Sequence, residues 1–227
     1  MMELELITKV YPITKNCQLL YERGEHALLG ISPFNSYFSE KNIAILSNWA
    51  MKNFKSFNFF IPDEPYVYTL MALGYDKVKA IKKSKRQANY LKNKCLRALT
   101  GLDLSTNEAE ALILDFRYLN KNKNYLSALK FYEDKYANDS EFRINCIETS
   151  KQVVETRTYL SYDRLEIAVK YLLAELPLFF NSVSILGKKE GVFCYRYCPL
   201  LIQTVFEKKN GMVLNNQGYL IIDIESN

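Results

Sequence analysis

Apolar positions in this chain occur in two patterns: short continuous runs and longer stretches with a helical period. Short continuous runs bounded by turn residues are typical of buried strands. They occur at residues 26–32 (HALLGIS), 57–61, 192–197 and 219–224. The second run is closed by Pro62 to Pro65, where two prolines favour a turn. We therefore predict four buried strands.

Between these runs, apolar residues recur every three or four positions, which is the spacing of one helix face. A helix is expected to begin at Ser39, because serine is a good N-cap and Glu40 suits the positive end of the helix dipole. A short helix at residues 66–73 should end at Gly74, a common C-terminal cap. Further helices are predicted at residues 77–98, 107–119, 125–136, 141–156 and 163–180.

Strands that alternate with helices imply an α/β fold with a mainly parallel central sheet flanked by helices. The chain contains no internal repeat, low-complexity tract or linker-like segment. Its 227 residues are enough for one compact domain with a sizeable core. We therefore expect residues 1–227 to form a single domain.

Composition favours a soluble protein without metal or disulfides. The N-terminus carries Glu3 and Glu5 where a signal peptide needs positive charge, and the most apolar run, residues 171–180, is too short to cross a bilayer. No zinc-ligand spacing exists around His26, the only histidine. The cysteines form no CxxC pair, and we expect them to be buried; they are Cys17, Cys95, Cys146, Cys194 and Cys198. These features predict a cytoplasmic protein with no cofactor and no membrane association.

The positive charge of the chain is concentrated in one predicted helix. Residues 76–97 contain nine lysines and arginines and one aspartate, a local charge of +8, whereas the whole chain carries +5 and the rest therefore −3. At about 100° per residue, six of these charges fall within an arc of roughly 120°. This cationic stripe consists of Lys79, Lys82, Lys83, Arg86, Lys94 and Arg97. The face expected to contact the core consists of Ala80, Ile81, Ala88, Leu91, Cys95, Ala98 and Leu99.

The cationic stripe favours a nucleic-acid backbone as its partner. The plain alternative is a solvated lysine-rich face, but like charges repel one another and almost no acidic residue relieves that repulsion. A phosphate backbone would supply the counter-charge. A helix at a membrane surface would need bulky Trp or Phe anchors, whereas the opposite face here is rich in alanine.

Ser32 lies just past the end of the first predicted strand, in GISPFNSYFSE. Ligands of open α/β sheets bind at the carboxyl ends of strands, although a serine there is commonly only a turn former. The pattern is not that of a serine hydrolase, because Phe34 replaces the last glycine of GxSxG. His26 lies at the opposite end of the strand, about 20 Å away. If Ser32 is a nucleophile, a group other than histidine must take its proton.

Together with later motifs, this segment resembles the cyclodipeptide synthase family. Ser32 matches the acylated serine of the family and Asn35 its companion asparagine. Tyr171 and Glu175, in YLLAELP, match the YxxxE motif, and Tyr195, in VFCYR, matches the later catalytic tyrosine. Two side chains four apart on a helix point to one side, so a carboxylate there can hold the α-ammonium of an aminoacyl group and later accept its proton.

The resemblance, which covers residues 17–222, implies a fold and a mechanism. The fold is a Rossmann-like domain similar to the catalytic domains of class I tyrosyl- and tryptophanyl-tRNA synthetases. The mechanism is ping-pong: a monomer uses two aminoacyl-tRNAs, without a cofactor, and forms a cyclic dipeptide through an aminoacyl-Ser32 intermediate. The stripe corresponds to the tRNA-binding helix of the family. The first aminoacyl pocket would include Gly30, Phe60, Leu178 and Phe193, an apolar lining that favours cyclo-dileucine or another hydrophobic pair.

Each motif also has an ordinary structural interpretation. Tyr171 and Tyr195 could be packing residues, Glu175 an exposed helix charge, and Asn35 an Asx-turn residue. Their joint order and spacing favour the catalytic interpretation. One departure is Arg196, which stands where the family has histidine or proline and could help to bind the acceptor end of tRNA.

Two alternatives stay open at the level of sequence. A non-catalytic tRNA- or RNA-binding protein would need the basic helix but not Ser32, Glu175 or Tyr195. A divergent aminoacyl-tRNA synthetase-like domain is suggested by residues 82–86 (KKSKR), which resemble the KMSKS loop of class I enzymes. No HIGH-like motif accompanies that segment, however, and the segment itself is predicted to be helical.

Overall fold

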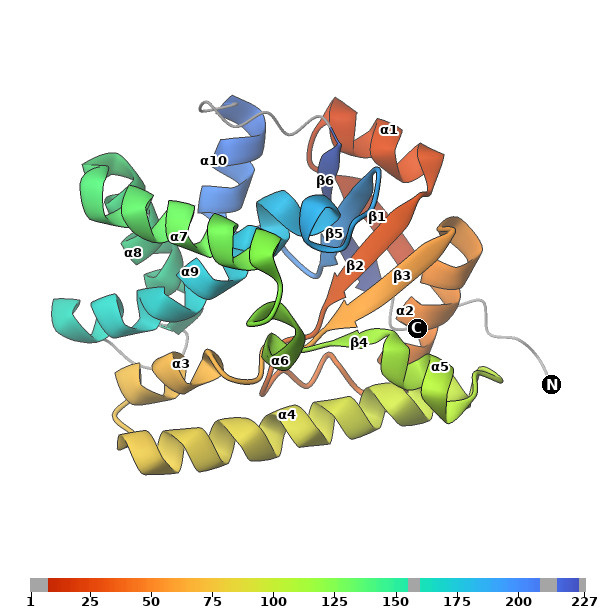
Figure 1. Ribbon diagram of the computed structural model, residues 1–227, viewed down its shortest axis with the longest axis horizontal. Helices are drawn as coiled ribbons and strands as arrows, with labels where there is room; N and C mark the ends of the chain where they lie inside the picture. Colours follow the sequence, from red (N-terminus) through yellow and green to blue (C-terminus); the bar gives the residue numbers. More distant parts are fainter. Residues whose placement is uncertain (1–7, 155–159, 209–215, 225–227) are drawn as a thin grey trace.

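The computed structural model describes residues 8–154, 160–208 and 216–224. Within these ranges six strands form one sheet, in the order β1-β6-β5-β2-β3-β4 (Figure 1). The strands are β1 (Thr8–Pro12), β2 (His26–Gly30), β3 (Ser56–Phe60), β4 (Ile113–Leu114), β5 (Gly191–Tyr195) and β6 (Gln217–Ile224). All neighbouring pairs are parallel except β1 and β6. The mainly parallel sheet predicted from the sequence is confirmed.

Helices cover this sheet and extend beyond it at one end (Figure 1). They are α1 (Lys15–Arg23), α2 (Glu40–Asn53), α3 (Tyr66–Ala72), α4 (Lys77–Thr100), α5 (Thr106–Ala111), α6 (Phe116–Leu119), α7 (Lys123–Asn138), α8 (Ser140–Val154), α9 (Tyr162–Ile185) and α10 (Leu200–Lys208). As predicted, Ser39 caps α2, and its hydroxyl accepts a hydrogen bond from the backbone N–H of Asn42. The last two residues of the helix predicted at 141–156 lie outside the described residues.

The helix predicted at residues 107–119 is wrong. The chain there forms α5, then the two-residue strand β4 beside β3, and then α6. Asp115 begins α6, because its carboxylate accepts hydrogen bonds from the N–H groups of Arg117 and Tyr118. The sequence pattern also missed β1, α1 and α10. These elements have five to nine residues each, which is too short a stretch to establish a hydrophobic period.

The strand order reverses between β2 and β5. From β2 the chain moves to β3 and β4 on one side, and it later returns to β5 and β6 on the other side. A crevice forms at the carboxyl ends of the strands at such a reversal, and ligands of open α/β sheets bind there. Ser32 follows β2, and Tyr195 ends β5. The topology therefore places both residues at this crevice.

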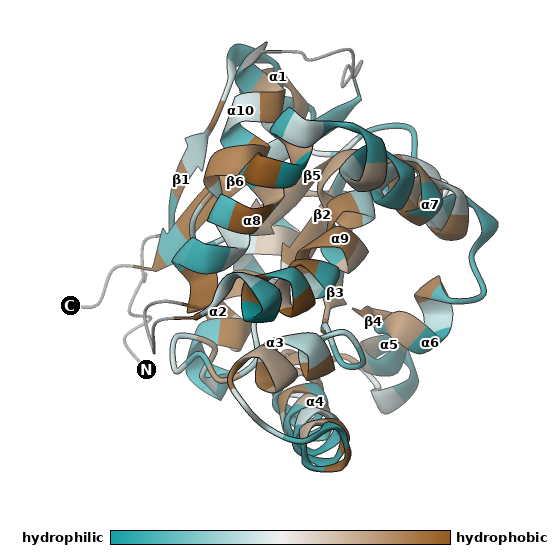
Figure 2. Ribbon diagram, turned by 90° about the vertical axis from the view of Figure 1, so that its left-hand side faces the viewer, coloured by the Kyte–Doolittle hydropathy of each residue, from teal (hydrophilic) through white to brown (hydrophobic). Residues whose placement is uncertain are grey.

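Helix α9 is the central helix of the core. All five residues of β2 are buried, and α9 buries residues along most of its length beside the sheet. In Figure 2 it is largely brown and passes through the middle of the view. Among the described residues it is the one helix long and apolar enough to span a membrane by length and composition, but 67% of its most apolar window is buried inside the protein. Such burial is that of a core helix.

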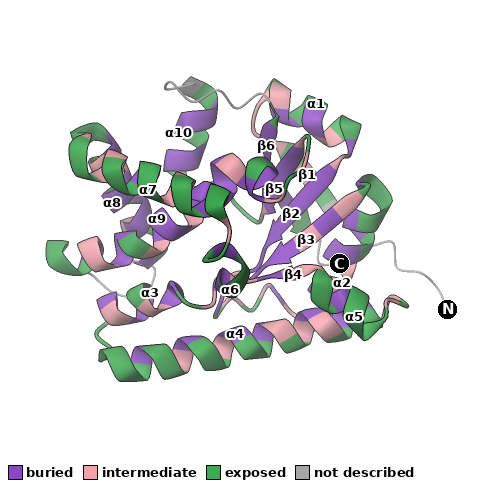
Figure 3. Cartoon of the chain, in the orientation of Figure 1, coloured by how far each residue is buried: buried purple, intermediate pink, exposed green. Residues whose placement is uncertain are grey.

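Helix α4 lies along the end of the sheet where the crevice opens, and most of its surface faces solvent (Figures 1 and 3). Its buried residues are Ala80, Ser84, Ala88, Leu91, Cys95, Ala98 and Leu99. The predicted core face is therefore correct except at Ile81, which is 45% exposed. Ser84 takes its place because the Ser84 hydroxyl donates to the backbone carbonyl of Asp63, in the segment between β3 and α3.

Candidate active site

A cavity opens at the carboxyl ends of β2, β3 and β5 and continues between α3, α8 and α9. Its lining brings together Ser32, Tyr171, Glu175 and Tyr195, which come from three distant parts of the chain. Ser32 is half-buried and faces this cavity, so the residue is not sealed inside the core. The fold thus assembles four of the five predicted catalytic residues around one space.

Tyr171 and Glu175 form a hydrogen-bonded pair on α9. The phenol of Tyr171 donates to Oε1 of Glu175 at 2.7 Å, as expected for residues four apart on one helix face. The ring of Tyr171 also meets the edge of the Tyr66 ring, at 5.7 Å between centroids. The tyrosine is therefore held on two sides and fixes the orientation of the carboxyl group.

Burial in the cavity controls the ionisation of Glu175. It raises the pKa of Glu175 to about 8, and the hydrogen bond from Tyr171 opposes that rise only in part. A free α-amino group has a pKa of about 8. Because the two pKa values are similar, a proton can pass between Glu175 and a bound amine at little energetic cost.

Tyr195 faces Ser32 from β5. Burial raises the pKa of Tyr195, and it outweighs the effect of the Ser32 hydroxyl, which lies close enough to the phenol to lower that pKa. The Tyr195 ring stacks on the Phe38 ring, with 6.0 Å between centroids, and meets the Tyr197 ring edge-on, with 5.0 Å between centroids. A neutral phenol in this position can donate a hydrogen bond to an oxyanion or relay a proton from the serine.

The apolar end of the cavity is built from the strands. Gly30, Phe60 and Phe193 line it, as predicted. A Cβ atom on Gly30 would lie 2.8 Å from Cζ of Phe193, so only glycine admits the ring at this distance. Leu178 is fully buried in the core and is not among the described residues that line the cavity, whereas its neighbour Phe179 is.

Comparison with known proteins agrees with this geometry. The family model described as "Cyclodipeptide synthase" matches residues 8–224. The cyclo(L-leucyl-L-leucyl) synthase of Staphylococcus haemolyticus is 31% identical over 94% of this chain and 94% of its own length. That of Bacillus subtilis is also 31% identical, over 92% of this chain and 87% of its own length. The chain belongs to the cyclodipeptide synthase family.

Solved structures of the family share this fold. The cyclodipeptide synthase of Bacillus thermoamylovorans has a TM-score of 0.88 at 30% identity, covering 96% of this chain and 97% of its own. The Mycobacterium tuberculosis synthetase has a TM-score of 0.86 at 24% identity, covering 96% and 94%, and is described as related to type I tRNA synthetases. The predicted synthetase-like α/β fold is confirmed, and the chain is an aminoacyltransferase of this family.

Asn35 lies in the turn after Ser32 but is not among the described residues that line the cavity of the synthase. Its side-chain oxygen accepts a hydrogen bond from the N–H of Tyr37 at 3.0 Å, which is the geometry of an Asx turn. Asn35 therefore shapes the turn that follows the serine.

His26 has no part in the site. It is buried at the amino end of β2, where its Nδ1 lies 2.9 Å from the hydroxyl of Ser56. Burial lowers the pKa of His26 to about 4, and the charge of Lys188 acts in the same direction. The only imidazole of the synthase is thus neutral and lies at the end of the strand opposite to Ser32.

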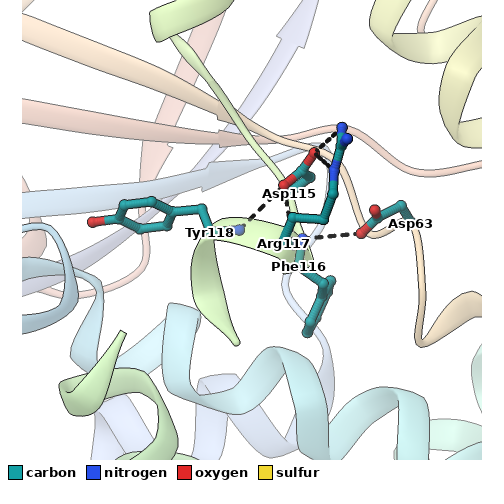
Figure 4. Close-up of polar contacts among 5 residues, drawn as sticks. All are labelled: Asp63, Asp115, Phe116, Arg117 and Tyr118. Carbon is teal, nitrogen blue, oxygen red and sulfur yellow. Dashed lines mark hydrogen bonds and ion pairs between the residues drawn. The ribbon is translucent and has the colours of Figure 1, made fainter. Parts of the chain in front are cut away.

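The cavity wall is tied to neighbouring helices through Asp63, which follows the cavity residue Pro62. The carboxylate of Asp63 accepts a hydrogen bond from the N–H of Phe116 at 3.0 Å (Figure 4). The Phe116 ring in turn packs on Phe60 at 5.6 Å. Because the carbonyl of Asp63 also accepts from Ser84, this short segment connects the wall to α4 and α6.

The cationic stripe on α4 divides into paired and unpaired charges. Arg97 forms an ion pair with Glu40 at 2.7 Å, and Lys79 forms one with Asp76 at 3.1 Å. Lys82 and Arg86 are exposed and form no ion pair with any residue that the structure describes. Lys83 and Lys94 approach the turn after Ser32: Lys94 Nζ donates to the carbonyl of Phe38 at 3.2 Å. The stripe therefore begins beside the mouth of the cavity.

The sequence analysis missed three serine and threonine residues of the cavity: Thr69 on α3, and Thr149 and Ser150 on α8. The Ser150 hydroxyl is buried without a hydrogen-bond partner among the described residues. Nothing in the sequence pattern distinguishes these residues from ordinary helix positions. They become part of the site only because α3 and α8 pack against α9.

Proposed function

We propose that this synthase joins two aminoacyl groups, each delivered on tRNA, into a cyclic dipeptide through an aminoacyl ester on Ser32. The observation that carries the proposal is the meeting of Ser32, Tyr195 and the Tyr171–Glu175 pair in one cavity beside a cationic helix. No histidine is available there as a general base.

The proposed reaction has three transfers. Ser32 Oγ attacks the ester carbonyl of the first aminoacyl-tRNA, and the ribose hydroxyl leaves with the proton from the serine, relayed through Tyr195. The α-amine of the bound group, deprotonated by Glu175, attacks the second ester and releases the second tRNA. The amine of the dipeptidyl-enzyme then attacks the Ser32 ester, which closes the ring and restores the hydroxyl.

We further propose leucine as the preferred amino acid. The cavity end formed by Phe60, Phe179 and Phe193 is apolar, and two relatives at 31% identity are named cyclo(L-leucyl-L-leucyl) synthases. One methylene changes discrimination by only about 1–3 kcal/mol, so related hydrophobic residues should also react. We propose that the enzyme acts as a cytoplasmic monomer.

The test supplies the purified protein with a mixture of charged tRNAs and identifies products and acylated protein by mass spectrometry. Wild type should yield a cyclic dipeptide, and Ser32→Ala should yield neither product nor acylated protein while still binding tRNA. Ser36→Ala is the matched control, because Ser36 is exposed in the same turn. Binding of tRNA with no product from wild type would instead support the non-catalytic alternative.

A further inference from the structure

Arg196 is a positive charge whose two neighbours in the chain belong to the cavity wall. It lies between Tyr195 and Tyr197, which both line the cavity, and it is exposed. Its guanidinium carbon is 4.7 Å from the centre of the Tyr37 ring. No carboxylate forms an ion pair with it among the residues that the structure describes. The charge is therefore positioned and is in no ion pair of the described residues, although the Asp223 carboxylate also acts on the Tyr37 phenol.

Tyr37 is a fixed platform for this guanidinium. Its phenol oxygen accepts a hydrogen bond from the N–H of Ile224 in β6 at 3.1 Å, and its own N–H is bound by Asn35. Its ring meets the Phe38 ring edge-on at 5.2 Å. A guanidinium stacked on an aromatic face keeps its N–H edge available, and that edge matches two oxygens of a phosphate.

Two lysines of α4 approach the same turn, one near its start and one near its end. Lys83 Nζ lies 5.4 Å from the centre of the Phe34 ring, and Lys94 Nζ is bonded to the Phe38 carbonyl. Arg196 directly follows β5, the strand on the opposite side of β2 from β3. The turn that follows Ser32 therefore lies among three positive charges, two from the cationic stripe and a third, Arg196, from a separate part of the chain.

We infer that Arg196, stacked on Tyr37, binds a phosphate at the acceptor end of the aminoacyl-tRNA while Ser32 attacks the ester. This inference rests on the proposed function. The terminal ribose of the tRNA carries the ester. When Ser32 attacks that ester, the phosphodiester groups of the last one or two nucleotides must therefore lie near Ser32. An unpaired, pre-oriented guanidinium next to Tyr195 is the group best placed to receive one of them.

The experiment measures the rate of Ser32 acylation by leucyl-tRNA as a function of tRNA and salt concentration, for wild type, Arg196→Gln and Arg196→Lys. Arg196→Gln should raise KM for leucyl-tRNA about tenfold. In a plot of log kcat/KM against log salt concentration, the slope of this variant should be less steep than that of wild type by about 0.7 to 1, which is the contribution of one phosphate contact. Arg196→Lys should keep the salt slope and recover only part of KM, because a lysine retains the charge but not the planar fork. Lys15→Gln, an exposed charge on α1, is the control for loss of charge alone.

A second substrate separates phosphate binding from positioning of Tyr195. A leucyl ester without nucleotides has no phosphate, so Arg196→Gln and wild type should acylate Ser32 from it at equal rates. The inference would be overturned if Arg196→Gln slowed acylation equally with both substrates, or if its salt slope with leucyl-tRNA equalled that of wild type. Failure of wild type to react with leucyl-tRNA would instead refute the proposed function, so the two failures are distinguishable.

Discussion

The carboxyl group of Glu175 combines a raised pKa with a fixed orientation. Burial raises its pKa to about 8, so the carboxyl group is mainly protonated at neutral pH. An α-ammonium bound beside it favours the carboxylate, because opposite charges attract strongly where water is scarce. The group can therefore hold the amine as an ion pair and remove its proton when the amine must react.

This pKa predicts the pH dependence of the reaction. We expect kcat/KM for acyl transfer to rise with pH up to about 8, because the carboxylate is the form that binds the ammonium. Glu175→Gln should lower activity at least 100-fold, and its residual rate should lack this rise. A pH–rate profile of both proteins between pH 6 and 9 checks the prediction, and the same rise in both would contradict it.

The same shift predicts an effect on stability. Between pH 4.5 and 8 the unfolded chain loses the proton of Glu175 while the folded protein retains it, so the free energy of unfolding falls as pH rises through this window. Glu175→Gln cannot lose a proton and should be more stable than wild type at pH 8.5, by an amount on the order of 3 kcal/mol. Urea unfolding at pH 5 and pH 8.5 measures the difference, which should be small at pH 5.

Gly30 lies close to the rings of Phe193 and Tyr195 in the cavity wall. Alanine there would place its Cβ 2.8 Å from Cζ of Phe193 and 3.2 Å from Cδ2 of Tyr195, so both rings must move. We expect Gly30→Ala to destabilise the protein by about 1–3 kcal/mol and to slow acylation of Ser32. The double variant Gly30→Ala/Phe193→Leu removes the clashing ring atoms, and recovery of stability in chemical denaturation would show that this contact is the cause.

Among the secondary-structure elements, α4 divides its roles between two faces. One face packs on the core through alanine and leucine, and the other presents charges to solvent. Arg97 and Lys79 also form ion pairs within the protein, so substituting them could change both RNA binding and the stability of the protein. Lys82 and Arg86, exposed and outside the ion pairs of the described chain, are the better probes.

Removing these two charges should weaken the use of tRNA without loss of stability. Lys82→Gln/Arg86→Gln is expected to raise KM for aminoacyl-tRNA about tenfold or more and to reduce the salt slope by about 1 to 2. A steady-state titration at two salt concentrations tests this, with Lys41→Gln/Lys52→Gln on α2 as a charge-matched control. Equal KM values for the two double variants would show that α4 does not contact the RNA backbone.

Across the full fold, the two ends of the sheet have different roles. The carboxyl end holds the cavity, and the amino end of β2 holds the buried His26. Because burial lowers its pKa from 6.5 to about 4, only the unfolded chain takes up a proton at this residue between those values. Stability should therefore fall as pH drops from 6.5 to 4, by at most about 3 kcal/mol.

The variant His26→Gln separates stability from catalysis. Between pH 7 and pH 5 its melting temperature should fall less than that of wild type. It should retain turnover at pH 7.5, because no imidazole contacts Ser32. A large loss of turnover in a folded His26→Gln protein would contradict the placement of the site.

The sequence pattern was most informative where one local rule applied over many residues. The 24-residue helix α4 was anticipated almost to its ends because its charge and apolar periods agree. Residues 107–119 misled the same reasoning, because an edge strand of two residues carries no period of its own. Its partner β3 lies more than fifty residues away, and the sheet overrides the helical preference of the segment.

The amino-acid sequence was sufficient for the class of fold, for the charged helix and for the spacing of Tyr171 and Glu175, since each depends on neighbours within a few residues along the chain. The meeting of Ser32 with Tyr195, the placement of Thr149 and Ser150 in the cavity, and the stacking of Arg196 on Tyr37 depend on how distant elements pack. Burial, and with it the raised pKa of Glu175, likewise arises only when those elements exclude water together.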